Sequence, residues 1–325
     1  MLKQNGQTYQ IMQSDMDILN QVIRDDLGSN VALISQIAEY IIAGGGKRIR
    51  PLLTLLCGRI AGYKEGNLLH QMAAMIEYIH TATLLHDDVV DESGLRRGRK
   101  TANTLFGNAA SILVGDFIYT RSFQMMVKSN SLRLLEIMAK STNKISEGEV
   151  LQLLNIGKSN LSEEEYFQVI KHKTAVLFEA AARVAAIVAG ANAATEELLA
   201  NYAINIGIAF QIVDDILDYI GNSSDMGKNV GDDLLEGKVT LPLIYLLKHG
   251  SSTEQQAIAQ AINEPGSAQI DYIISAIKNS KAIEYCQNLA HSYVNNAISQ
   301  LVHFPPSAYK DAMLKLADQA ISRFS

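Results

Sequence analysis

The chain has 325 residues, with 28 lysines and arginines against 34 aspartates and glutamates, which gives a formal net charge of −6. Apolar residues make up 48% and charged residues 19% of the sequence, a composition that excludes a mainly disordered chain. The acidic balance and the lack of long basic clusters argue against nucleic acid as a main partner. The two cysteines, Cys57 and Cys286, are too few for a disulfide scaffold or a four-cysteine zinc site. We expect both to be buried thiols in a reducing cytoplasm.

The scarcity of proline predicts the fold class. The five prolines leave residues 107–241 without one. Long proline-free stretches rich in alanine, leucine, isoleucine and glutamate are typical of helices, and no alternating strand pattern is present. We therefore predict an all-α fold and a single domain over residues 1–325.

Apolar periodicity and turn signals place the helices. In chain order, the predicted ranges are 9–27, 31–43, 51–61, 69–85, 109–128, 131–155, 162–178, 195–219, 239–248, 280–302 and 307–322. A capping box at Ser162–Glu165 marks the start of one of them. The stretches 174–192 and 199–213 are apolar on most of their circumference, which predicts central helices of a bundle.

No part of the sequence predicts a segment in a membrane. No stretch reaches 18 consecutive apolar residues, and the first ten residues are polar. We therefore expect neither a membrane span nor a secretory signal, and we expect the protein to stay in the cytoplasm.

The motif Asp-Asp-x-x-Asp occurs twice. Its two copies consist of Asp87, Asp88 and Asp91, and of Asp214, Asp215 and Asp218. With 17 aspartates in 325 residues, chance predicts only about 0.05 copies per chain. On a helix the three carboxylates of a copy can point to one side, where they repel one another unless a cation joins them. Carboxylates without histidine or cysteine suit Mg²⁺, which commonly bridges substrate phosphates. The pair of motifs predicts several Mg²⁺ ions around a diphosphate, whereas a solvated acidic helix end would explain a single copy.

Two basic turns supply the matching cations. The first is Gly44–Pro51, with the sequence GGGKRIRP, and the second is Arg96–Arg99, which begins five residues after Asp91. Backbone N–H groups at a glycine turn and helix start, together with lysine and arginine, favour an anion such as a diphosphate. The first turn alone could be an ordinary basic surface turn. An acidic triplet beside two arginines fits a metal-bridged phosphate better than either feature does separately.

These motifs carry a resemblance that covers nearly the whole chain. They are GGGKRIRP, IHTATLLHDDVVDESGLRRG, FGNAASILVGDFIYTRSFQMM, EGEVLQL, KTAVLFEAA, AFQIVDDILDY and GKNVGDDLLEGKVTLPL. The sequence resembles the trans-polyprenyl diphosphate synthases, which elongate isoprenyl chains, and within them the bacterial octaprenyl-forming branch. The resemblance implies a helical bundle of the isoprenoid synthase type with a central apolar cavity. It also implies a homodimer.

The resemblance implies a specific reaction. Isopentenyl diphosphate units would be added head to tail to an allylic primer, farnesyl diphosphate, giving a long all-trans product, octaprenyl diphosphate, for quinone side chains. Mg²⁺ and the cations would stabilise the departing pyrophosphate, so that an allylic carbocation forms in a dry pocket. The double bond of isopentenyl diphosphate would attack this cation, and a proton would then be lost to pyrophosphate. The apolar product would be delivered to a membrane.

The resemblance also implies roles for individual residues. The six motif aspartates would bind Mg²⁺ and, with Lys173, carry the catalysis. Contacts to the allylic diphosphate are implied for Arg96, Lys173, Thr174, Gln211, Lys228 and Lys238. Contacts to isopentenyl diphosphate are implied for Lys47, Arg50, His80, Arg97 and Arg323. His86 receives no role.

Product length is expected to depend on side chains below the first motif. Ala82 and Thr83 precede Asp87 by about one turn, so they lie roughly 6–7 Å deeper along the helix. Their small side chains would leave a path for the growing chain. Its floor is expected from Phe123, Met126 and Met138, although plain core packing is the alternative for each of them.

Two other functions remain open at this point. A terpene cyclase also ionises a metal-bound diphosphate, but it would not need a second diphosphate pocket and usually lacks a second Asp-Asp-x-x-Asp motif. A non-catalytic or regulatory subunit could share the fold, although the intact second motif counts against it. Product analysis separates the first alternative, and turnover by the purified chain excludes the second.

Overall fold

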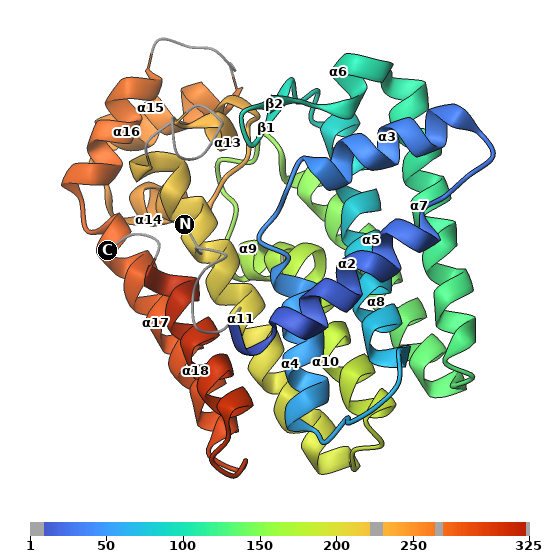
Figure 1. Cartoon of the computed structure of the whole chain (residues 1–325). Coiled ribbons are helices and arrows are strands. Elements are labelled where there is room, and N and C mark those ends of the chain that lie inside the picture. Colours follow the sequence, from blue (N-terminus) through green and yellow to red (C-terminus); the bar gives the residue numbers. More distant parts are fainter. Residues whose placement is uncertain (1–9, 222–229, 264–268, 323–325) are drawn as a thin grey trace. The chain divides into compact units, whose positions relative to one another are not determined.

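The fold consists almost entirely of helices (Figure 1). The computed structural model describes residues 10–221, 230–263 and 269–322 of the chain. The chain divides into two compact units. Unit 1 comprises Met1–Ser141, Leu177–Ala203 and Gln300–Leu316, and unit 2 comprises Thr142–Val176, Ile204–Ser299 and Ala317–Ser325. The single domain over residues 1–325 stays a prediction.

Unit 1 is organised around one long helix. The elements that lie wholly inside it are α2 (Gln13–Asp26), α3 (Ala32–Ala43), α4 (Ile49–Ile60), α5 (Leu68–Val90), β1 (Leu95–Arg96), β2 (Arg99–Lys100), α6 (Ala102–Phe106) and α7 (Asn108–Lys128). Helix α5 packs against α2, α4 and α7 (Figure 1). Its residues Met72, Ile76 and Ile79 are fully buried. Because α5 has helices on several sides, the aspartate motif at its end stands on a firmly packed support.

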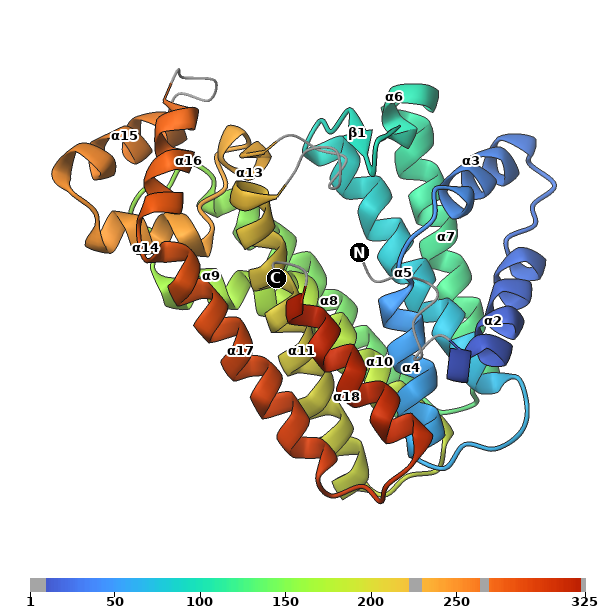
Figure 2. The same ribbon diagram turned by 60° about the vertical axis from the view of Figure 1, so that its left-hand side comes forward.

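Unit 2 contains a group of shorter helices. The elements wholly inside it are α9 (Glu163–Ile170), the π-helix η1 (Lys171–Ala175), α13 (Asp232–Leu235), α14 (Leu241–His249), α15 (Ser252–Asn263) and α16 (Ile270–Asn279). Figure 2 shows α14, α15 and α16 side by side, and they contact one another. The apolar core of the unit includes Ile212, Ile216, Leu243 and Ile258. Its burial holds the second aspartate motif in place.

Several long helices have residues in both units. They are α8 (Leu132–Asn155), α10 (Val176–Val188), α11 (Ala193–Ile220), α17 (Ala282–Leu301) and α18 (Ala308–Ile321). The alanines of α10, among them Ala181, Ala182 and Ala185, are fully buried, as are Ala203 and Ala209 of α11. The prediction that these two stretches are buried helices is therefore confirmed.

The all-α prediction is confirmed, with four corrections in detail besides the short helices α6 and α13, which were also not predicted. The sequence analysis predicts no helix between residues 249 and 279, yet α15 and α16 lie there. The predicted helix 162–178 is interrupted by the π-helix η1. The predicted helix 69–85 continues to Val90 and so includes Asp87 and Asp88. The fourth correction is the antiparallel hairpin of β1 and β2, because no strand was predicted.

Two further expectations concern cysteines and membranes. Cys57 and Cys286 are both buried and unpaired, as predicted. Among the described residues, no helix combines the length and the apolarity that crossing a bilayer requires.

Candidate active site

The first aspartate motif lies where α5 ends. Asp91 follows the last residue of the helix, and Asp88 is buried one turn earlier. Arg96 of β1 donates to Asp88 Oδ1 from Nε at 2.8 Å, and its second nitrogen lies 2.7 Å from the same oxygen. The hairpin of β1 and β2, which follows the motif in the chain, therefore places Arg96 against Asp88. The sequence analysis placed Asp88 and Arg96 at one diphosphate, and the structure brings them together.

Two arginines gather at His80, which lies on α5 two turns before the motif. Arg50 at the start of α4 has one guanidinium nitrogen 3.1 Å from Nε2 of His80. Burial lowers the pKa of His80 well below its usual value, and Arg50 and Arg97 lower it further. His80 is therefore neutral at pH 7 and accepts the Arg50 hydrogen bond through Nε2, since arginine can only donate.

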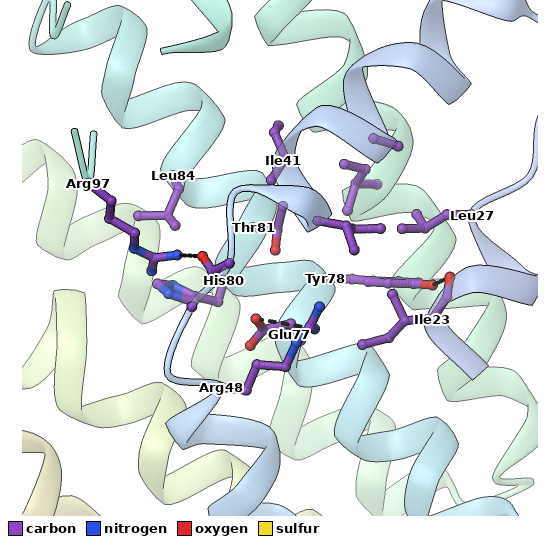
Figure 3. Close-up of a pocket in the computed structure, with 15 residues that line it drawn as sticks. Ile23, Leu27, Ile41, Arg48, Glu77, Tyr78, His80, Thr81, Leu84 and Arg97 are labelled. Carbon is purple, nitrogen blue, oxygen red and sulfur yellow. Dashed lines mark hydrogen bonds and ion pairs between the residues drawn. The ribbon is translucent and has the colours of Figure 1, made fainter. Parts of the chain in front are cut away.

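Arg97 completes this cluster. Its guanidinium donates to the carbonyl of Gly45, so it lies against the glycine turn (Figure 3). A Cβ added at Gly46 would lie 2.8 Å from the nearest Arg97 nitrogen, so a larger residue there would push the guanidinium aside. Arg97 itself has φ 54°, in the left-handed region. Of the residues predicted to bind isopentenyl diphosphate, Arg50, His80 and Arg97 are thus gathered in unit 1, together with Lys47 on the same turn.

The second aspartate motif lies near the end of α11. The buried carboxylate of Asp215 accepts a 2.6 Å hydrogen bond from the Tyr166 hydroxyl and a 2.9 Å bond from Gln211 Nε2. The Thr174 hydroxyl in turn donates to Gln211 Oε1 at 2.8 Å. Asp218 Oδ2 accepts from the backbone N–H of Asp233 at 3.3 Å. The structure therefore joins Thr174, Gln211 and Asp215 in one hydrogen-bonded chain, and their contacts to a diphosphate stay a prediction.

Negative charge is crowded around Asp215. Burial raises the pKa of its carboxyl to about 8, and the nearby Asp233 and Asp214 add to the increase. The hydrogen bonds from Tyr166 and Gln211 act in the opposite direction but do not cancel it. Like charges held this close are relieved by a divalent cation.

Lys173 lies on the π-helix. Its ammonium group is 2.6 Å from Oε2 of Glu149 on α8. The backbone of α8 comes very close here, because a Cβ added at Gly148 would lie 2.7 Å from the Lys173 backbone nitrogen. Single π-turns occur often at functional sites, where they redirect a side chain. The turn and the close approach together fix where Lys173 projects.

The remaining predicted diphosphate contacts have simpler outcomes. Lys238 pairs with Glu236 at 2.6 Å, within unit 2. Lys228 and Arg323 lie outside the described residues.

The donor chemistry of both motifs fits Mg²⁺. Within the described residues, no three side chains of histidine, cysteine, aspartate or glutamate are arranged to hold an ion as they stand. Each motif nevertheless presents only carboxylate oxygens, the hard ligands that Mg²⁺ prefers, and the charge crowding at Asp215 favours a cation. Because Mg²⁺ keeps waters and takes substrate phosphate oxygens, a site does not need three protein ligands in place beforehand.

The residues expected to set product length have mixed outcomes. Ala82, Met126 and Met138 are buried, and the Thr83 hydroxyl donates to the carbonyl of His80 at 2.9 Å. Phe123 does not fit a buried floor, because its side chain is 42% exposed. The ring packs instead on Tyr119 of the same helix. The predicted central cavity stays a prediction.

Sequence analysis missed three residues of the site. Tyr166, Gly148 and Glu149 contact Asp215 or Lys173, but none belongs to an aspartate motif or a basic turn. The stretch EGEVLQL contains Gly148 and Glu149, so only the family resemblance signalled them. His86, left without a role, directs Nε2 to the carbonyl of Ile112 at 3.2 Å.

Comparison with known proteins decides the family. The family model for polyprenyl synthetase matches residues 31–279. The chain belongs to the polyprenyl synthetase family. It is 48% identical over 310 residues to the octaprenyl diphosphate synthase of Haemophilus influenzae, covering 95% of this chain and 94% of that protein. It is equally identical over 310 residues to the Escherichia coli K12 enzyme of the same name, covering 95% and 96%.

A solved structure is similar throughout. The polyprenyl synthase from Caulobacter crescentus, crystallised with calcium and isoprenyl diphosphate, has a TM-score of 0.94, 43% identity and 98% coverage of both chains. The predicted isoprenoid synthase fold is therefore confirmed. As a member of this family, the chain is a prenyltransferase that adds isopentenyl diphosphate head to tail to an allylic diphosphate.

Proposed function

We propose that the chain makes octaprenyl diphosphate from farnesyl diphosphate and isopentenyl diphosphate in a Mg²⁺-dependent reaction. The 48% identity to two octaprenyl diphosphate synthases supports the product length. The product would supply a quinone side chain after delivery to a membrane. We further propose a cytoplasmic location, which the two buried, unpaired cysteines support.

The observation that carries the proposal is the cluster of Arg50 and Arg97 with the neutral His80, beside the glycine turn. A single diphosphate would be served by the aspartate motifs and their lysines and Arg96. The additional cluster gives the chain a second anion pocket, which an elongating enzyme needs for its second substrate. A terpene cyclase does not need one, so this pocket favours elongation over cyclisation.

Each group has a distinct task in the proposed reaction. Asp87, Asp91 and Asp214 would ligate Mg²⁺, with Asp88, Asp215 and Asp218 completing the two motifs. Bound Mg²⁺ would neutralise the negative charge that develops on the leaving diphosphate. Arg96 and Lys173 would each donate hydrogen bonds to the allylic diphosphate, which would favour its ionisation. Because His80 is neutral, it orients Arg50 in the other pocket without withdrawing a proton.

We also propose that the chain works as a homodimer through α7 and the start of α8. The exposed apolar side chains there are Ile112, Leu113, Phe123, Val127 and Leu132. A row of this kind on one pair of helices is typical of an interface between copies. The exposure of Phe123 supports this use of the ring in place of a chain-length role.

Release of pyrophosphate by the purified chain tests the proposed activity. We expect release only when farnesyl diphosphate, isopentenyl diphosphate and Mg²⁺ are all present. A cyclase would release pyrophosphate without isopentenyl diphosphate, and a regulatory subunit would release none. We further expect Arg97→Ala to raise the KM for isopentenyl diphosphate more than the KM for farnesyl diphosphate, because a charge-assisted contact to one substrate is lost. The opposite ranking would contradict the assignment of the pockets.

A further inference from the structure

Arg48 is the one arginine of the glycine turn that has no task in the proposed pocket. It lies between Lys47 and Arg50 in the sequence and directly precedes α4. Its backbone has φ 44°, in the left-handed region that disfavours any residue with a Cβ. Such a conformation persists only where surrounding contacts hold it, and it occurs often at functional sites. The contacts of the Arg48 side chain therefore need an explanation.

The Arg48 side chain reaches Glu77 of α5. Its Nη1 lies 3.6 Å from Oε1 of Glu77, and each side chain is only 16% exposed. Figure 3 shows the two facing each other in a small pocket of about 40 Å³ that Tyr78, His80 and Arg97 also line. Glu77 stands three residues before His80, so both project from the same face of α5. The pair lies beside the cluster at His80.

The charge of Glu77 is unexpected at this place. A carboxylate close to Arg97 and His80 repels a diphosphate that binds there. Burial and Arg96 lower the pKa of Arg97, whereas the Glu77 carboxylate raises it, so Glu77 is within electrostatic reach of the pocket. On Coulombic grounds alone, the pocket would bind an anion better without Glu77. Its presence therefore indicates another task.

We propose that Glu77 and Arg48 form a positioning pair for the pocket that binds isopentenyl diphosphate. The pair ties the turn to α5, the helix that carries His80. This tie holds Arg48 in its left-handed conformation, and it sets the direction in which Lys47 leaves the turn and Arg50 enters α4. Glu77 then acts on the diphosphate through Arg48 and not by direct contact. The inference rests on the proposed function, because it concerns the second substrate of that reaction.

The two possible roles of Glu77 predict opposite results for one substitution. Glu77→Gln keeps the size of the side chain and removes its charge. If Glu77 acts only through its charge, the variant binds isopentenyl diphosphate more tightly than the wild type. If it positions the turn, the variant binds more weakly, by on the order of tenfold. Isothermal calorimetry with isopentenyl diphosphate alone measures this Kd without any turnover.

A second variant and a control complete the experiment. Arg48→Asn removes the cation but keeps a residue that tolerates a left-handed backbone, so we expect a similar loss of affinity. Because the two residues act as a pair, the double variant should bind no more weakly than Arg48→Asn alone. Glu39→Gln makes the same chemical change on the exposed surface of α3 and should leave the Kd unchanged.

Steady-state kinetics give the remaining readout. For Glu77→Gln we expect a higher KM for isopentenyl diphosphate, with little change in kcat or in the KM for farnesyl diphosphate. Tighter or unchanged binding of isopentenyl diphosphate, or additive losses in the double variant, would overturn the positioning pair. Elongation by the wild-type enzyme tests the proposed function separately. An active wild type with an unimpaired Glu77→Gln variant refutes the inference alone.

Discussion

The middle aspartates of the two motifs have different partners. Asp88 faces the guanidinium of Arg96, whereas Asp215 accepts hydrogen bonds from the uncharged donors Tyr166 and Gln211. Arg96 compensates the charge of Asp88, whereas burial and the nearby Asp233 and Asp214 raise the pKa of Asp215 and so disfavour its ionised form. The second motif should therefore depend more strongly on Mg²⁺.

Substitution of a motif aspartate should abolish turnover while the fold survives. We expect Asp87→Ala and Asp214→Ala each to reduce kcat by about a hundredfold or more, because each would remove a proposed Mg²⁺ ligand. Circular dichroism should show an unchanged helix content, since the substitution also relieves like-charge crowding. The exposed Asp25→Ala is the matched control. Near-normal activity in both motif variants would refute the metal assignment.

The buried carboxylate of Asp15, outside both aspartate motifs, leads to a second prediction for a single residue. Burial raises the pKa of Asp15, but hydrogen bonds from His70 and Arg59 outweigh it and lower the pKa to about 2. A lowered pKa stabilises the folded state above the unfolded value near 3.9, and this stabilisation is lost as the pH falls toward 2. The contribution at pH 7 is roughly 2 kcal/mol.

Urea unfolding at different pH values checks this linkage. We expect Asp15→Asn to lower the free energy of unfolding relative to the wild type at pH 6–7, and the difference should shrink as the pH falls below about 4. Asp17→Asn, an exposed change on the same helix, should show no such pattern. A difference that stays constant from pH 7 to pH 3 would contradict the assigned cause.

At the scale of elements, periodicity predicts most of the helices, and the motifs point to the residues that the structure gathers within each unit. The missed helix α15 had a signal in the sequence, because Ser251 and Glu254 form a reciprocal capping box. The π-helix η1 had no signal in the sequence. It lies where α8 comes very close at Gly148, and such a contact between helices cannot be read from the local sequence. The ring of Phe123 also could not be placed, because apolar periodicity does not tell a core face from an exposed one.

The close approach of α8 and η1 can be tested with one methyl group. Gly148→Ala would place a Cβ 2.7 Å from the Lys173 backbone nitrogen, so the π-helix must shift and displace the Lys173 ammonium. We expect a loss of roughly 1–3 kcal/mol in unfolding free energy and a marked loss of kcat. Gly28→Ala, where an added Cβ meets nothing within 4 Å, is the control. Equal activities of the two variants would show that η1 does not depend on Gly148.

An aromatic side chain introduced on α5 below the first motif should shorten the product. Ala82 is buried about one turn before Asp87, so Ala82→Phe is expected to stop elongation early and leave the first condensation largely intact. Chromatography of the dephosphorylated products measures this shift. Ala32→Phe, on the exposed start of α3, should keep the wild-type product. If the Ala82 variant still makes the full-length product, the growing chain does not pass this residue.

At the scale of the whole molecule, each unit contains one aspartate motif with its own cations. Unit 1 carries the first motif, Arg96 and the cluster on the glycine turn, while unit 2 carries the second motif, Lys173 and Lys238. The exposed apolar row on α7 and the start of α8 also belongs to unit 1. The family model for polyprenyl synthetase covers residues 31–279 and so includes both aspartate motifs.

The size of the product tests the central claim most directly. The purified chain is incubated with farnesyl diphosphate, labelled isopentenyl diphosphate and Mg²⁺, and the dephosphorylated products are sized by chromatography against all-trans standards. The account predicts successive additions that end at the octaprenyl product, and none when Mg²⁺ is removed by chelation. A final product no longer than geranylgeranyl diphosphate, or cyclic products formed without isopentenyl diphosphate, would contradict it.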